Sequence, residues 1–146
     1  MSTNDPANDP ADDPASRAAA ARRRVQLERV AASLRVLHKH LMDEARAEFE
    51  RERGPVPSAA AFLGLLMGDP WFGWLRPLSA AMADLDALLD VEAPGPDHAR
   101  RVRLRFEALV TDEGEGDFPG HYREDRQRSP DVVMAHAAVR LALRPL

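Results

Sequence analysis

Two histidines have the residue type and the position that metal or haem binding would need. At about 100° per residue along a helix, His38 falls on the same face as a series of leucines. His136 falls on the same face as a series of valines. Helical bundles hold metals and haem groups between facing helices, often through imidazole. Glu48 and Asp86 also lie toward apolar helix faces and would complete a ligand set, so one hypothesis is a metal or haem site.

The spacing of these residues favours a simpler interpretation. Carboxylate bundle sites use Glu-x-x-His and zinc proteases use His-Glu-x-x-His, and the sequence contains neither pattern. Each histidine is then expected to pack at a helix interface with one hydrogen bond to a neighbour. We therefore expect no cofactor, and a metal or haem held by His38 and His136 stays as the alternative.

The sequence lacks the familiar motifs of covalent catalysis. It contains no G-x-S-x-G segment, no glycine-rich phosphate loop and no cysteine. Ser79 with Asp86 and His38 is the one combination that would suit a serine-dependent enzyme. Nothing in the spacing of these residues specifies a reaction, so we expect a non-enzymatic protein without catalytic residues.

An aromatic segment bounded by Gly68 and Pro77 is the most distinctive part of the chain. It contains Trp71, Phe72 and Trp74. Tryptophan is enriched at the centres of protein interfaces, so we predict an interaction surface at these three residues. The alternative is an aromatic plug that closes one end of a helical bundle, and the two roles are compatible.

Charge and composition limit the choice of partner. The 146 residues carry a net charge of −4, and residues 1–16 hold four aspartates and no basic residue. The rest of the chain is therefore formally neutral, and we expect neither nucleic acid nor membrane as a partner. There is no signal-peptide pattern and no apolar run of the ~18 residues that a membrane span needs, which favours a cytoplasmic protein. The absence of isoleucine and the single lysine are typical of a GC-rich bacterial genome.

The chain divides into a tail and one helical domain. In residues 1–16 a proline recurs at every fourth position among aspartates, which predicts a disordered acidic tail. Residues 17–146 form a single predicted domain, in which leucines and valines recur at spacings of three and four. The expected helices run from about Ser16 to Arg53, from Ser58 to Met67, from about Pro77 to Leu89, over 97–111 and from Ser129 to Leu143. The segment 119–126 is a candidate for a further short helix.

No segment shows the alternation of a β-strand. The sequence thus predicts an all-α fold, a bundle of four to five helices. The last predicted helix is apolar nearly all round, which predicts burial on two sides, either as a central helix or as a dimer contact.

A resemblance supports this fold. The segment Asp69 to Ser79, DPWFGWLRPLS, with Leu37-His38 before it and Ala135-His136 after it, resembles a family of small uncharacterised bacterial helical proteins. The resemblance covers roughly residues 25–145 and implies a helical fold. No activity is attached to the family, so the resemblance implies no functional residues.

The sequence therefore leads to one main functional expectation. We expect a non-enzymatic helical protein that acts through protein–protein contacts, either with another protein or as a homodimer through its last helix. The aromatic segment is the expected second contact surface. The alternative remains a bundle that binds a metal or haem.

Overall fold

The computed structural model describes residues 13–91, 93–111 and 113–146, and this part of the chain is helical without strands. The all-α prediction is confirmed, with six α-helices rather than four to five. A 3-10 helix, η2, joins α2 to α3 in the aromatic segment. The elements are α1 Pro14–Arg53, α2 Ala59–Gly68, η2 Pro70–Leu75, α3 Arg76–Leu89, α4 Pro96–Leu109, α5 Asp117–Arg128 and α6 Pro130–Leu143.

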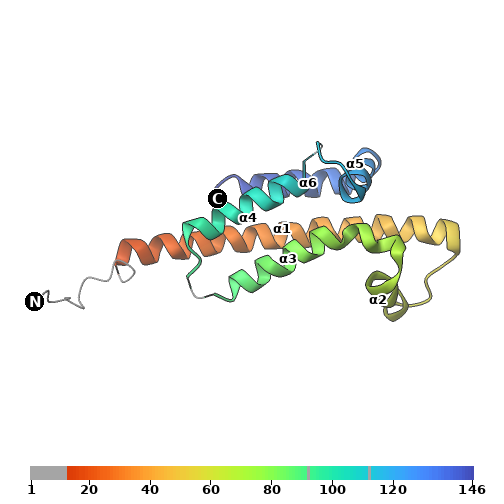
Figure 1. The fold of residues 1–146 in the computed structure, drawn as a ribbon, viewed down its shortest axis with the longest axis horizontal. Coiled ribbons are helices and arrows are strands. Elements are labelled where there is room, and N and C mark those ends of the chain that lie inside the picture. Colours follow the sequence, from red (N-terminus) through yellow and green to blue (C-terminus); the bar gives the residue numbers. More distant parts are fainter. Residues whose placement is uncertain (1–12, 92, 112) are drawn as a thin grey trace, which may run out of the picture.

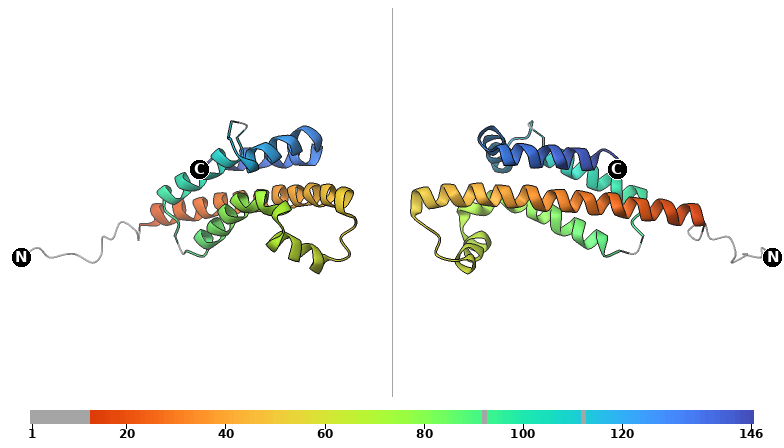
Figure 2. Two further views of the ribbon diagram at one scale, coloured as in Figure 1. Left: turned by 45° about the vertical axis from the view of Figure 1, so that its right-hand side comes forward. Right: turned by 180° about the vertical axis from the view of Figure 1, so that it is seen from behind.

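The long helix α1 is the element that the other helices share. Helices α3 and α6 both pack along α1, and α4 lies against α3 and α6 (Figure 1 and Figure 2). The predicted stripe of α1 faces these helices and is fully buried. Its members are Leu27, Val30, Leu34, Leu37 and Leu41. Burial of this stripe, at ~25 cal/mol per Å² of apolar surface, holds the bundle together.

Local sequence explains where the helices begin and end. The Ser58 hydroxyl accepts a hydrogen bond from the Ala61 amide at 3.1 Å, and the Ser129 hydroxyl accepts one from the Val132 amide at 3.4 Å. Both predicted N-caps are therefore confirmed. Helix α1 ends at Gly54, whose φ of 90° lies in the left-handed region that favours glycine.

The start of α1 differs from the prediction. The helix begins at Pro14, with Asp13 as its N-cap, so Ser16 is an exposed residue of the first turn and not a cap. Proline suits the first turn, where its missing amide hydrogen has no intrahelical partner, and this explains the earlier start. The predicted disordered tail otherwise lies outside the described residues.

The last helix is buried on one side only. Val132, Val139 and Leu143 face α1 and are buried, whereas Met134 is 72% exposed and Leu141 is 63% exposed. The prediction that α6 is a central helix, covered on two sides within the chain, is therefore wrong. Periodicity finds apolar residues, but it does not show whether the fold has enough elements to cover both faces.

Candidate functional site

His38 makes its hydrogen bond with α3. Its Nε2 atom lies 3.0 Å from the Ser79 hydroxyl oxygen, and that hydroxyl donates to the Leu75 carbonyl at 3.3 Å. When the hydroxyl donates to this carbonyl, Nε2–H of His38 donates to the serine oxygen. Partial burial lowers the pKa of His38 below its usual value, because the charged imidazolium loses solvation.

Asp86 is not part of this contact. It forms an ion pair with Arg35 at 3.0 Å on the exposed surface between α1 and α3. The structure therefore brings Ser79 and His38 together but leaves Asp86 apart.

His136 makes its hydrogen bond with α5. It is almost fully buried, and its Nδ1 atom lies 2.6 Å from the Tyr122 hydroxyl oxygen, also buried. The two candidate ligand histidines thus contact different helices, α3 and α5. In the part of the chain that the structure describes, no three His, Asp or Glu residues are grouped so that they could hold a metal ion. Each histidine thus makes a hydrogen bond to a residue of a neighbouring helix.

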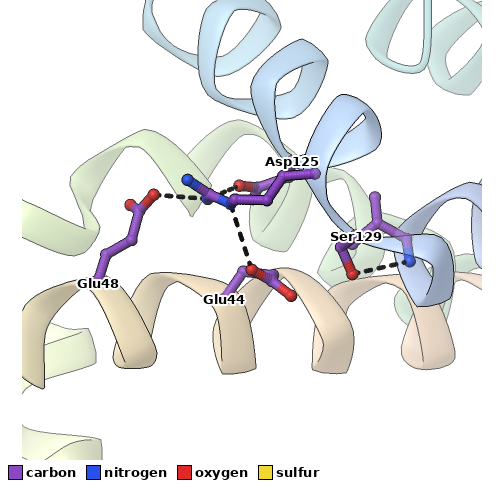
Figure 3. Close-up of polar contacts among 6 residues, drawn as sticks. Glu44, Glu48, Asp125 and Ser129 are labelled. Atoms are coloured by element: carbon purple, nitrogen blue, oxygen red, sulfur yellow. Dashed lines mark hydrogen bonds and ion pairs between the residues drawn. The ribbon is translucent and has the colours of Figure 1, made fainter. Parts of the chain in front are cut away.

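Glu48 belongs to a charged cluster between α1 and α5, shown in Figure 3. The Arg128 guanidinium lies 2.5 Å from a Glu48 carboxylate oxygen and 2.6 Å from one of Asp125. It lies 3.6 Å from a carboxylate oxygen of Glu44. One cation is therefore shared by three carboxylates, and the cluster carries excess negative charge when all three are ionised.

Asp125 is the unusual member of this cluster. Its side chain is almost completely buried, and Oδ2 has no hydrogen-bond partner. Burial raises the pKa of Asp125 to about 6, although the nearby Arg128 opposes the shift. The carboxyl is therefore neutral in mildly acidic solution. In that state no buried negative charge is left without a hydrogen-bond donor at Oδ2.

Sequence analysis missed this cluster, although signals for it are present. Glu44 and Glu48 are one turn apart beside the buried stripe of α1, and Asp125 and Arg128 are one turn apart on α5. No local pattern in the sequence indicates that α5 packs against this part of α1.

The aromatic segment is mostly interior. Phe72 is 1% exposed and Trp74 is 8% exposed, and Trp74 stacks on His121 of α5 with ring centroids 4.7 Å apart. Trp71 is partly exposed and packs edge-on against Phe49. Phe72 and Trp74 therefore fill one end of the bundle, as the alternative of an aromatic plug describes, while Trp71 and the edge of Trp74 each line a surface cleft. The interaction surface at Trp71, Phe72 and Trp74 stays a prediction.

Exposed apolar side chains gather instead on α2 and α6. Helix α2 projects from the bundle at the C-terminal end of α1 (Figure 1) and contains no charged residue. None of its residues is fully buried, and Met67 is 75% exposed. On α6 the exposed face carries Val133, Met134, Ala137, Ala138 and Leu141.

Comparisons with protein-family models, with curated proteins and with solved structures found no match. In the described residues, no helix is both long enough and apolar enough to cross a membrane.

Proposed function

We propose that this chain is a non-enzymatic helical protein that acts through protein–protein contacts. The observation that carries the proposal is α2, an uncharged apolar helix without a fully buried residue. The outer face of α6 supports the proposal in the same way.

A helix that is apolar on every side is normally buried, because water contact with apolar surface is unfavourable. In α2, Phe62, Leu65 and Leu66 pack partly against the core, but Leu63 and Met67 face solvent. Contiguous exposed apolar patches larger than a few hundred Å² are rare on monomeric proteins and mark protein-binding surfaces. A partner protein with its own apolar surface would remove this patch from water.

The glycines of α2 support close approach by a partner. A Cβ atom added to Gly64 or Gly68 would meet no atom within 4 Å. Glycine in a helix interior costs about 1 kcal/mol relative to alanine, and internal packing gives no reason for Gly64. Gly64 and Ala60, one turn earlier, are small residues beside Leu63 and Met67, so the backbone of another helix can pack closely there.

The proposal can be tested by photo-crosslinking in a bacterial host, with a photoreactive amino acid at Met67 or at Met134. Covalent adducts with protein are expected at both positions, because both side chains are exposed and apolar. Arg29, exposed on the outer face of α1, is the control position and should give none. Adduct formation at Met67 and Met134 no greater than at Arg29 would refute the proposal.

A further inference from the structure

We infer that the partner of α6 is a second copy of this chain, whose α6 packs antiparallel against it. The inference rests on the proposed function, because it names the partner of one of the two surfaces. In this arrangement Met134 lies opposite Leu141 of the second copy, and the two-fold axis passes between Ala137 and Ala138.

The exposed face of α6 has the composition of a helix–helix contact. Met134, Ala137, Ala138 and Leu141 follow the i, i+3, i+4, i+7 spacing of one helical face. Val133 flanks this stripe and is also exposed. The face contains no charged residue between Asp131 at one end and Arg140 and Arg144 toward the other.

The stripe is symmetric in side-chain size. Two alanines form its centre, and one large apolar side chain lies on each side, at residues 134 and 141. Each large residue is about 5 Å from the centre along the helix axis. A two-fold dimer requires such a self-complementary surface, since residue i contacts j and j contacts i. The alanines let the helix axes approach closely, and the large residues meet at both ends of the contact.

Charge favours the antiparallel direction. The N-terminal end of α6 carries Asp131 and the C-terminal end carries Arg140 and Arg144, all exposed. A parallel pair would place like charges together at both ends. An antiparallel pair brings the acidic end of one copy to the basic end of the other, and it also opposes the two helix dipoles.

The contact is small. It is confined to one face of a helix of 14 residues, whereas obligate dimers bury about 2,000 Å² or more. We therefore expect a reversible dimer with a dissociation constant in the micromolar range rather than an obligate dimer.

Cysteine crosslinking can test both the partner and the direction, because the chain has no cysteine of its own. Ala137→Cys should form a disulfide dimer on mild oxidation, since the two copies of residue 137 flank the two-fold axis. Met134→Cys alone should not, because its two copies lie about 10 Å apart, too far for a disulfide. Met134→Cys combined with Leu141→Cys should crosslink efficiently. Ala47→Cys, exposed on α1, is the matched control and should stay monomeric.

Self-crosslinking of Met134→Cys as efficient as that of Ala137→Cys would overturn the antiparallel direction. Sedimentation equilibrium of the full chain tests the dimer itself. Dimerisation at tens of micromolar that is lost in Leu141→Glu, with an unchanged thermal midpoint, supports the inference. A strictly monomeric chain whose photoreactive Met134 variant captures a different protein overturns the dimer and leaves the proposed function standing. A monomeric chain without any adduct refutes both.

Discussion

Replacing Asp125 by asparagine should stabilise the protein at neutral pH. The substitution removes the charge of a buried carboxyl while keeping its shape. The pKa of Asp125 is raised from 3.8 to about 6, and each pKa unit corresponds to 1.36 kcal/mol. The full shift would be worth about 3 kcal/mol. Water reaches the partly exposed Glu44, Glu48 and Arg128 and screens the cluster, so we expect a gain of about 1–2 kcal/mol.

The direction of the pH dependence follows from the raised pKa. The folded protein holds the Asp125 proton more tightly than the unfolded chain does. The stability that this group contributes is therefore complete below pH 3.8 and is lost as the pH rises from 3.8 to about 6. Above pH 6 its contribution is constant. Asp125→Asn has no such loss. Its free energy of unfolding should therefore exceed that of the natural chain only slightly near pH 4 and most strongly above pH 6.

Urea unfolding followed by circular dichroism at pH 4.5, 6 and 7.5 measures this difference. Glu124→Gln, an exposed neutralised carboxylate on the same helix, is the matched control and should change the free energy of unfolding by less than ~0.5 kcal/mol at each pH. If Asp125→Asn is less stable than the natural chain at pH 7.5, the ion pair with Arg128 outweighs the burial of the charge, and the reasoning is refuted.

Three further substitutions test the fold, one of them with a matched control. Trp74→Ala should cost about 3–5 kcal/mol in unfolding free energy, because it empties a buried aromatic site. Ser129→Ala should lower the free energy of unfolding by about 1 kcal/mol, because α6 loses its N-cap. Its control, Ser16→Ala, lies in an exposed helical position and should change the free energy of unfolding by less than ~0.5 kcal/mol. Equal effects of the two substitutions would contradict the assigned caps. Tyr122→Phe removes the buried hydrogen bond to His136 and should cost about 1–3 kcal/mol. Chemical denaturation measures all three, and a neutral Tyr122→Phe would show that the bond is not stabilising.

Local signals in the sequence were enough for most of the helices. Ser58 and Ser129 identify helix starts because capping involves residues only three positions apart. The leucines of α1 identify a buried face because the helical period is fixed. Both features are properties of short segments, so they can be inferred before the fold is known.

The candidate site depends on distances that no local pattern specifies. Trp74 looks the same in the sequence whether it fills the core or faces a partner, and only the position of His121 on α5 decides between them. Met134 and Val132 are both apolar residues of one helix, yet only Val132 is covered. Asp125 acquires its raised pKa from burial, and Glu48 and Glu44 of α1, far away in the chain, raise it further.

The pairing of α1 with α6 has a consequence for biosynthesis. These helices lie at opposite ends of the described chain, yet they pack along each other (Figure 2). A ribosome adds 5–20 residues per second, so roughly 5–20 s separate the emergence of α1 from that of α6. During this interval the leucine stripe of α1 lacks its main cover. Until α6 has been made, this apolar surface of the nascent chain is open to non-native contacts that favour aggregation.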